Sequence, residues 1–375
     1  MRLLRQTPTP TRSRRRPRAP LAWVGQGFLL LLGLYVLYTL GSNLTRNPTL
    51  FVQNVVDGLK LGFVYALIAL GYTMVYGIVR LINFAHGDVF MVGAFTSFYA
   101  VTRYRLHAWP QAVFPSIPSG LSVVVGSITV ILLSMVVCTV MAVTIERVAY
   151  KPLRDAPRIA ALITAIGVSF FLEFFGALYF VFSPRFIPYK SPFDVVAWYI
   201  SDGFHPIVTG QEIPAKSITF SNIFLITMTA SILVQLLLQF IVRRTKIGMA
   251  MRASSFDKPT ARLMGINVDQ IISFTFAIGA AFAGLGGVLY AIAYSSIWTQ
   301  LGILPGLKAF VAAVLGGIGS LPGAFLGSLI MGQAEQLTMA YISTPMRDAV
   351  AFTILIVVLL IRPTGLFGEA AKEKA

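Results

Sequence analysis

Charged side chains are scarce in this sequence. They make up 12% of the 375 residues, whereas 56% are hydrophobic and the mean hydropathy is +0.77. Soluble domains carry about 25% charged residues, so this chain has too few to cover a water-facing surface of its size. The scarcity excludes an ordinary soluble globular protein.

Acidic residues are the scarcer of the two charge types. The chain has 14 of them against 30 lysines and arginines, which gives a net charge of +16. The positive charges lie in short segments between apolar stretches and at the N-terminus, not along one continuous face. We therefore expect no nucleic-acid binding, although such a net charge is common in proteins that bind it.

Cysteine, histidine and nucleotide-binding motifs are also rare or missing. The one cysteine, Cys138, lies in an apolar stretch, which excludes an intrachain disulfide and predicts a small residue facing lipid or another helix. His86, His107 and His205 show no metal-ligand spacing and no nucleophile motif accompanies them. No phosphate-binding G-x-x-x-x-G-K-[ST] motif occurs, so we expect neither a cofactor nor enzymatic activity in this chain.

Long apolar stretches are what the sequence does contain. Several approach the roughly 20 residues that a helix needs to cross a hydrocarbon core about 30 Å thick. They predict an all-α, polytopic transmembrane helical bundle of about 8–10 spans, with possible broken or half-helices. The segment 307–318 is too short to cross alone and is rich in small residues, which favours a half-helix or a re-entrant segment. The predicted spans are 21–40, 54–79, 84–102, 121–145, 160–183, 221–242, 271–294, 307–318, 323–340 and 347–361.

The N-terminus resembles a long signal peptide but differs from one. Residues 1–20 contain seven arginines and no acidic residue, and the apolar stretch 21–40 follows. That stretch is longer than the usual apolar region of a signal peptide, and no A-x-A cleavage site follows it. We expect a disordered basic tail and an uncleaved first span. An organelle transit peptide is the alternative.

Basic residues are distributed unevenly among the connecting segments. With the N-terminus inside, 21 of the 30 lysines and arginines fall in segments predicted to be cytoplasmic and 7 in segments predicted to be outside. This bias follows the positive-inside rule and predicts that both chain ends are cytoplasmic. The predicted organisation is a basic tail at 1–20, a transmembrane domain at 21–365 with an outer loop at 184–220 and an inner loop at 243–270, and a cytoplasmic tail at 366–375.

The inner loop 243–270 contains a short predicted helix over residues 258–264. Asp257 or Ser255 would cap its N-terminus, Pro259 suits its first turn, and Gly265 would end it. A helix of two turns is marginal in water by itself, which favours contact with another protein. The alternative is a solvated loop whose arginines only follow the positive-inside rule.

The segment 81–88 brings an amide, an imidazole and a carboxylate to the start of a span. In one interpretation Asn83, His86 and Gly87 line a translocation path, since polar groups in membranes usually face protein or water. In the other, Asn83 caps the next helix, His86 lies in the interfacial zone, and Asp88 favours the positive end of the helix. The two interpretations are compatible.

The glycine-rich segment 315–324 also has two interpretations. Gly316, Gly317 and Gly319 suit close helix packing and a tight turn. They also suit a break between two half-helices, which transporters use to present backbone groups to a ligand. We therefore include these glycines among the candidate residues of a translocation path.

Three ionisable residues lie in or beside predicted spans. Glu173 and Glu335 are acidic residues within spans, and we expect each to meet a partner or a cavity. Lys308 lies at the outer start of a helix, where its long side chain is expected to reach the interface. A relay for protons would need a longer chain of such groups, so the sequence weighs against an ion-coupled carrier.

Three stretches carry a family resemblance. They read GLKLGFVYALIALGYTMVYGIVRLINFAHGDVFMVGAF at 58–95, RASSFDKPTARLMGINVDQIISFTFAIGAAFAGLGGVL at 252–289 and AFVAAVLGGIGSLPGAFLG at 309–327. The chain resembles the LivH-type permease subunit of branched-chain amino-acid ABC importers. Within the second stretch, Pro259-Thr260-Ala261 followed by Gly265 is similar to a degenerate coupling loop of the E-A-A, three residues, G type. Only Ala261 and Gly265 match that pattern.

The resemblance implies a membrane permease subunit of an ATP-driven importer in a bacterial inner membrane. It implies that ATP is used by two cytoplasmic ATPase subunits, with a LivM-type second permease and a periplasmic binding protein as further partners. The residues implied to dock an ATPase are Arg252, Ala253, Pro259, Thr260, Ala261, Arg262 and Gly265.

The implied substrate is leucine, isoleucine, valine or a broader set of neutral amino acids. Related permeases serve urea or short amides, which is one alternative. An ion-coupled secondary transporter is a second alternative, and an intramembrane enzyme is disfavoured because no catalytic constellation is found.

Overall fold

The computed structural model describes residues 38–39, 41–154, 156–201, 203–207, 214, 216–362 and 364–368. The predicted tail 1–20, nearly all of the predicted first span 21–40 and residues 369–375 lie outside this part of the chain. Contacts divide the chain into two compact units, Met1–Phe51 and Val52–Ala375. In the first unit, residues 41–46 are helical, and the other nine predicted spans lie in the second.

Helices occupy each of those nine predicted spans, which confirms an α-helical membrane fold. Five stretches are long and apolar enough to cross a membrane by length and composition: Pro48–Val79, Ser119–Leu153, Ile159–Gly176, Asn222–Arg244 and Val268–Tyr294. The span helices are α2 (Pro48–Val79), α3 (His86–Thr102), α5 (Ser119–Ile145), α6 (Arg158–Gly176), α7 (Asn222–Arg244), α10 (Val268–Tyr294), α11 (Ile303–Gly316), α12 (Leu321–Tyr341) and α13 (Met346–Ile361).

α6 is shorter than its predicted span, and α11 is the shortest of the nine span helices. α6 ends at Gly176 instead of 183, because the chain turns there and the Phe182 amide donates to the Gly176 carbonyl at 3.1 Å. α11 has 14 residues, which at 1.5 Å per residue is about 21 Å. Since a hydrocarbon core is about 30 Å thick, α11 cannot cross it alone, in agreement with the prediction for 307–318.

α2 and α10 lie at the centre of the bundle, and α5, α6 and α7 lie at its surface. In the most apolar stretch of 18 residues, 83% of the residues are buried in α2 and 72% in α10, against 17–28% in the three outer helices. Large apolar side chains spaced four residues apart, such as Ile128, Leu132 and Val136, are exposed along α5. Such a stripe is what a helix facing lipid requires.

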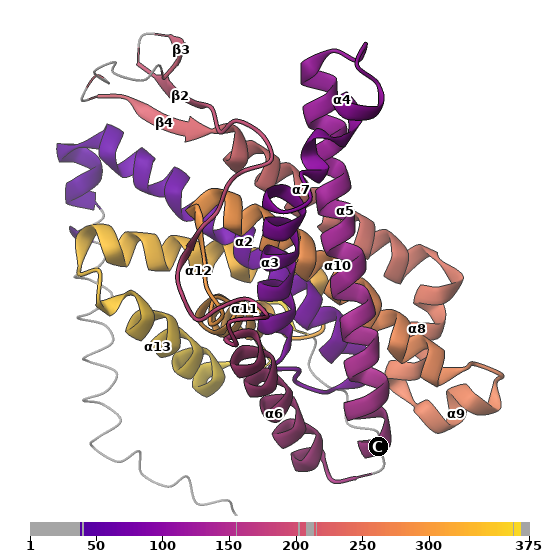
Figure 1. Cartoon of the computed structure of the whole chain (residues 1–375). Helices are drawn as coiled ribbons and strands as arrows, with labels where there is room; N and C mark the ends of the chain where they lie inside the picture. Colours follow the sequence, from indigo (N-terminus) through magenta and orange to yellow (C-terminus); the bar gives the residue numbers. More distant parts are fainter. Residues whose placement is uncertain are drawn as a thin grey trace, which may run out of the picture. The chain divides into compact units, whose positions relative to one another are not determined.

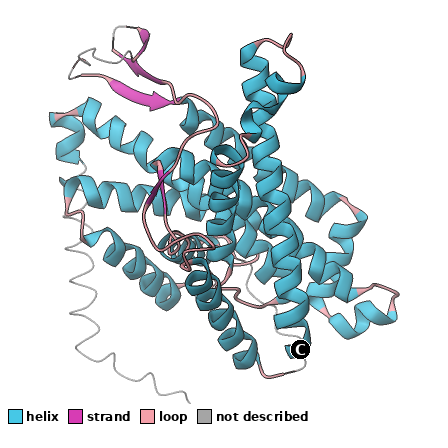
Figure 2. Ribbon diagram, viewed as in Figure 1, coloured by secondary structure: helices cyan, strands magenta, loops and turns pink. Residues whose placement is uncertain are grey.

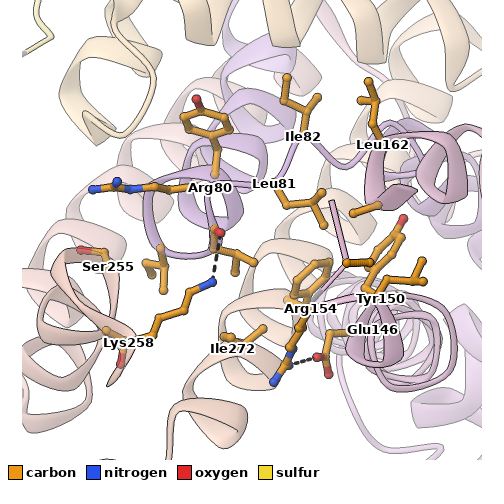
Figure 3. A pocket seen from close by; sticks show the side chains of 18 of the residues that line it. Arg80, Leu81, Ile82, Glu146, Tyr150, Arg154, Leu162, Ser255, Lys258 and Ile272 are labelled. Atoms are coloured by element: carbon orange, nitrogen blue, oxygen red, sulfur yellow. Dashed lines mark hydrogen bonds and ion pairs between the residues drawn. The ribbon is translucent and has the colours of Figure 1, made fainter. Parts of the chain in front are cut away.

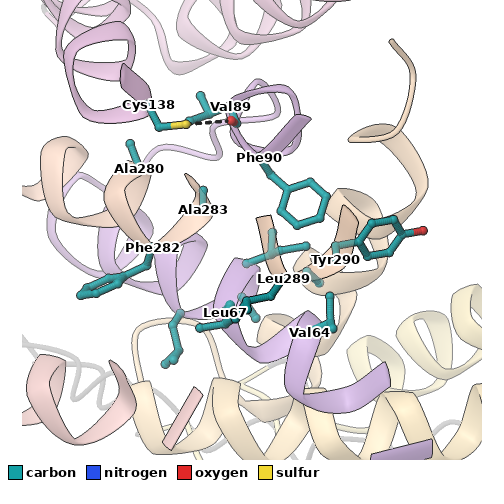
Figure 4. Packing of buried hydrophobic residues seen from close by; sticks show 14 of the residues in the cluster. Val64, Leu67, Val89, Phe90, Cys138, Ala280, Phe282, Ala283, Leu289 and Tyr290 are labelled. Atoms are coloured by element: carbon teal, nitrogen blue, oxygen red, sulfur yellow. Dashed lines mark hydrogen bonds between the residues drawn. The ribbon is translucent and has the colours of Figure 1, made fainter. Parts of the chain in front are cut away.

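Small residues bring α3, α5 and α10 close together (Figure 4). The Ser134 hydroxyl on α5 donates to the Gly93 carbonyl on α3 at 2.8 Å, and the Cys138 thiol donates to the Val89 carbonyl at 3.3 Å. In the same view Phe90 of α3 lies beside Tyr290 of α10. Cys138 is therefore a small core residue between helices, as predicted.

Strands of the predicted outer loop 184–220 and helices of the predicted inner loop 243–270 lie at opposite ends of the bundle (Figure 1). Parts of the predicted outer segments lie at the top, where three strands pair in the order β3-β2-β4. Parts of the predicted inner loop lie at the lower right. At the top are β2 (Ala197–Ile200), β3 (Phe204–Pro206), β4 (Ile218–Ser221) and α4 (Trp109–Val113), and at the lower right are α8 (Lys246–Phe256) and α9 (Lys258–Leu263).

Strands are a small part of the described fold (Figure 2). Besides the three-stranded sheet, β1 (Ile187–Pro188) pairs with β5 (Ser296–Ile297) in an antiparallel ladder. This pair ties the loop that follows α6 to the segment that follows α10. The long loop 184–220 is thus held to the bundle through its backbone, which its prolines and aromatic residues did not predict.

Candidate functional site

α8 and α9 form a pair of short helices within the loop 243–270. The Thr245 hydroxyl caps α8 by accepting from the Gly248 amide at 3.0 Å, and the Asp257 carboxylate caps α9 by accepting from the Thr260 amide at 3.3 Å. Gly265 follows with a φ of +81°, a left-handed conformation that costs other residues about 1–2 kcal/mol. The predicted helix, its Asp257 cap and its glycine end are confirmed.

The seven residues predicted to dock an ATPase divide into an outward and an inward group. Ala261 is 4% exposed and packs in a cluster with Val268 and Ile272 of α10, so it anchors α9 to the bundle. Ala253 is half-buried. The exposed members are Arg252, Pro259, Thr260, Arg262 and Gly265.

Two large apolar side chains of the same segment were missed by sequence reasoning. Leu263 and Met264, at the end of α9, are 86% and 78% exposed. Apolar side chains on the span helices have lipid to cover them, whereas these lie in a loop predicted to be in water. Covering a side chain of this size stabilises a complex by about 1.5–3 kcal/mol. Their position between Arg262 and the helix-ending Gly265 was the sequence signal that could have marked them.

Ion pairs connect α9 to the body of the bundle. Arg262 of α9 lies 3.5 Å from Asp269 at the start of α10, and Lys151 lies 3.3 Å from the same carboxylate. Arg154 pairs with both Asp269 and Glu146, and Glu146 is fully buried. A displacement of α9 would therefore act on α10 and on the turn that follows α5. The exposed pairs of Asp269 with Arg262 and Lys151 contribute about 0–1 kcal/mol each to stability, so they do not hold α9 rigidly.

A cavity of about 710 Å³ lies between α9, the end of α2 and the turn after α5 (Figure 3). The Lys258 ammonium donates across it to the Val79 carbonyl at 3.5 Å. Leu81, Tyr150 and Ile272 form part of its wall. Lys258 thus provides a second connection between α9 and the bundle, to α2.

Asn83 does not cap α3, contrary to one of the two interpretations of segment 81–88. The helix begins after Ala85 without a side-chain cap. The Asn83 amide oxygen instead accepts from the Tyr150 hydroxyl at 2.7 Å, and Asn83 is 4% exposed. Asn83 therefore makes a long-range contact to the turn after α5 instead of a local cap. A buried side-chain amide requires a hydrogen-bond partner, and the Tyr150 hydroxyl supplies it.

His86 and Gly87 are buried in contacts between helices. His86 is 2% exposed, and its ring lies edge-on to Tyr72 with the centroids 4.7 Å apart. A side chain at Gly87 would lie 3.3 Å from the Gly306 Cα and collide with the Gly302 carbonyl. Within this chain both residues hold α3 against α2 and α11, and their assignment to a translocation path stays a prediction.

Asp88 and Glu173 border one small cavity of about 150 Å³. Asp88 is 1% exposed and accepts a hydrogen bond from the Ser169 hydroxyl of α6. Glu173, one turn further along α6, lines the same cavity. The expectation that Glu173 meets a partner or a cavity is confirmed, and the sequence did not predict that Asp88 shares it.

The glycine-rich run forms the turn between α11 and α12. Gly317 and Gly319 have φ of +105° and +97°, and the Ser320 hydroxyl caps α12 by accepting from the Gly323 amide at 3.2 Å. The Gly316 carbonyl accepts from the Phe367 amide at 3.0 Å, so that backbone group is satisfied within the chain. Gly319 is exposed and borders a cavity of about 450 Å³.

Lys308 is buried instead of reaching the interface. It is 3% exposed, and its ammonium lies 2.5 Å from Glu335 and 2.6 Å from Asp348. The Tyr65 hydroxyl donates to the other oxygen of Glu335 at 2.8 Å. Opposite charge this close offsets the cost of removing both groups from water, which is why Lys308 does not need to extend outward. The expectation that Glu335 meets a partner is confirmed.

Comparisons with known proteins show which sequences this chain is similar to. The family model described as branched-chain amino acid transport system, permease component, matches residues 54–359. The high-affinity branched-chain amino acid transport system permease protein LivH of Escherichia coli is 41% identical over 86% of this chain and 97% of its own. BraD of Pseudomonas aeruginosa, named in the same words, is 39% identical over 86% and 98%.

More distant similarities extend to other cargo. The autoinducer 2 import system permease protein LsrC of Yersinia enterocolitica is 27% identical over 41% of this chain and 45% of its own. Among solved structures, PsaBC from Streptococcus pneumoniae in complex with Fab covers 88% of this chain and 97% of its own at 14% identity, with a TM-score of 0.39. A likeness that low carries no argument about this fold.

Proposed function

Because the chain belongs to the family of branched-chain amino acid transport permeases, we propose that it is a membrane subunit of an ATP-driven importer for branched-chain or other neutral amino acids. It forms half of a translocation path and docks a cytoplasmic ATPase through α8 and α9. A second permease of LivM type, a second ATPase and a periplasmic binding protein complete the importer. The chain lies in a bacterial inner membrane with both ends in the cytoplasm.

The observation that carries the docking proposal is the exposed pair Leu263 and Met264 at the end of α9. An apolar tip on a water-exposed loop is favourable only if a partner covers it. The tip connects to the bundle through Arg262, Asp269 and Arg154. Closure of the ATPases on ATP would displace α9, and these connections would pass the displacement to α10 and to the turn after α5.

The test is uptake of labelled leucine into proteoliposomes that contain the assembled importer. We expect uptake to require ATP inside and the binding protein outside, and to survive a proton ionophore. Uptake that persists without ATP and collapses with the ionophore would instead establish an ion-coupled carrier, for which Asp88 and Glu173 supply buried carboxylates. Competition by unlabelled valine, urea and acetamide then separates an amino-acid importer from one for urea or short amides.

A further inference from the structure

The cavity of about 450 Å³ that Gly319 borders lies beside α8. Its wall also comes from the ends of α2 and α7, the turn between α11 and α12, and residues 367–368. On the predicted orientation this end of the bundle faces the cytoplasm. Among the described residues two arginines and no acidic side chain line the cavity, so it attracts anions.

The two arginines, Arg243 and Arg252, lie next to each other and are both exposed. The Arg252 guanidinium donates to the Val242 carbonyl, which places it beside the backbone of Arg243. The Arg243 side chain forms none of the hydrogen bonds or ion pairs found among the described residues. Like charges repel, and an anion between them offsets the repulsion. The pair suits a phosphate, whose oxygens match the planar fork of donors of a guanidinium.

The rest of the cavity is polar but uncharged. Thr73 of α2 is 1% exposed and lines the cavity, and its hydroxyl has no hydrogen-bond partner among the described residues. Burial of a hydroxyl without a partner is unfavourable. Ser320 lines the same cavity at the start of α12, where the first amides of a helix have no acceptor within it. A ligand with hydroxyl groups would supply the missing partners.

Two glycines bring α2 and the turn before α12 together around this space. Gly77 lies one helical turn after Thr73, and a side chain at Gly77 would lie 3.3 Å from the Gly319 Cα. Gly319 precedes Ser320 in the turn. The polar groups of α2 and of the turn therefore border one small volume, and the absence of side chains at both glycines keeps it open.

An apolar stripe on α7 leads to the arginines. Leu233, Leu236, Leu237 and Phe240 are exposed along this helix. The ten residues from Leu233 to Arg243 correspond to about 15 Å at 1.5 Å per residue. That length is half of a hydrocarbon core about 30 Å thick, which is the depth of one leaflet. The acyl chains of a lipid can therefore lie along α7 while its phosphate reaches Arg243.

We propose that this cavity binds an anionic phospholipid of the inner leaflet. Arg243 and Arg252 bind the phosphate, as basic pockets at the cytoplasmic side of membrane proteins do. An uncharged headgroup such as glycerol enters the cavity toward Thr73 and Ser320, and the acyl chains lie along α7. A choline headgroup would add a positive charge to a site that already has two, so the site favours phosphatidylglycerol over phosphatidylcholine.

The bound phosphate would hold α8 against the rest of the bundle. α8 contributes Met251, Arg252 and Ser255 to the cavity, and the remaining lining comes from outside the loop 243–270, apart from Arg243. The lipid site itself does not depend on the proposed function. Its consequence does: if α8 and α9 dock an ATPase, phosphatidylglycerol should speed ATP-driven uptake.

The test is native mass spectrometry of the chain, purified in an uncharged detergent with the subunits that accompany it. Phosphatidylglycerol, phosphatidylcholine and glycerol 3-phosphate are titrated separately. We expect phosphatidylglycerol to bind about tenfold more tightly than either of the others, since only it offers both an anionic phosphate and acyl chains. Equal affinity for the two lipids would overturn the anionic site. Equal affinity for glycerol 3-phosphate would identify a soluble phosphate ester as the ligand and overturn the lipid.

Neighbouring arginines supply the matched comparison. Arg243→Gln should lower the affinity for phosphatidylglycerol about tenfold or more, since it removes hydrogen bonds to a charged group. Arg244→Gln should leave the affinity unchanged, because Arg244 is also exposed but does not line the cavity. Equal losses in the two variants would overturn the site.

Thr73→Val tests the position of the headgroup. The variant keeps the shape of the side chain and removes a hydroxyl that has no partner among the described residues, so the fold should not suffer. We expect the affinity for phosphatidylglycerol to fall about threefold, the effect of one neutral hydrogen bond. Unchanged affinity would overturn the placement of the headgroup inside the cavity.

Leucine uptake into phosphatidylcholine proteoliposomes, with and without phosphatidylglycerol, separates this inference from the proposed function. We expect phosphatidylglycerol to speed ATP-driven uptake by the unaltered protein and by Arg244→Gln, but not by Arg243→Gln. Selective lipid binding without ATP-driven uptake in any preparation would support the site and overturn the importer. ATP-driven uptake without selective lipid binding would support the importer and overturn the site.

Discussion

Gly265 is the single residue on which the shape of the docking segment depends. Its φ of +81° turns the chain from α9 toward α10, and its amide donates to the Arg262 carbonyl at 3.0 Å. A Cβ at this position would meet nothing within 4 Å. The requirement for glycine is therefore conformational and not steric, which makes the effects of two different substitutions separable.

We predict that Gly265→Pro abolishes leucine uptake and co-purification of the ATPase while membrane insertion continues. Proline fixes φ near −65° and lacks the amide hydrogen, so it can adopt neither the conformation nor the bond. Gly265→Ala is the control, since alanine tolerates the left-handed conformation at a cost of about 1–2 kcal/mol and should keep most of the activity. Normal uptake by the proline variant would remove the assignment of this loop to ATPase docking.

Features of the site that depend on residues close together in the sequence could be predicted. The Asp257 cap and the glycine end of α9 follow from spacing, and the structure confirms both. Asn83 had an equally good local role, but burial gave its side chain to Tyr150, 67 positions along the chain. Lys308 and Glu335 meet because α11 and α12 pack side by side. The sequence alone does not show which residues far apart along the chain lie close together in space, so these pairings could not be predicted.

At the scale of elements, apolar length predicted which segments are helical better than it predicted where helices end. All nine described spans were found, because a bilayer leaves an apolar stretch of about 20 residues few alternatives to a helix. The end of α6 was wrong because Val181 is held by tertiary contact, its carbonyl accepting from the Tyr99 hydroxyl at 3.0 Å.

We predict that Leu263→Ser combined with Met264→Ser lowers ATPase co-purification and ATP-driven uptake by about tenfold or more, since each exposed apolar side chain contributes about 1.5–3 kcal/mol when a partner covers it. Pull-down of the tagged chain at equal expression measures the effect. Val148→Ser is the control, because Val148 is 72% exposed in another segment predicted to be cytoplasmic. If the control and the double variant lose the ATPase equally, α9 is not the specific contact.

For the whole molecule, charge distribution and geometry lead to the same arrangement independently. The counts of lysine and arginine assign loop 184–220 to one side and loop 243–270 to the other. The structure, which contains no membrane, puts strands of the first loop and helices of the second at opposite ends of the bundle. The helices α8 and α9, which we propose dock an ATPase, and the strands of loop 184–220 thus lie at opposite ends, as the predicted orientation requires.

The orientation can be tested by labelling introduced cysteines, without removal of the natural Cys138. Cys138 is fully buried, so a membrane-impermeant maleimide should react poorly with the unaltered protein. In intact spheroplasts we predict that Lys190→Cys, exposed in the outer loop, is labelled, whereas Thr260→Cys, exposed on α9, is labelled only after the membrane is opened. The reverse pattern would place α9 outside the cell, where no ATP-driven subunit could reach it, and would overturn the orientation and the docking proposal together.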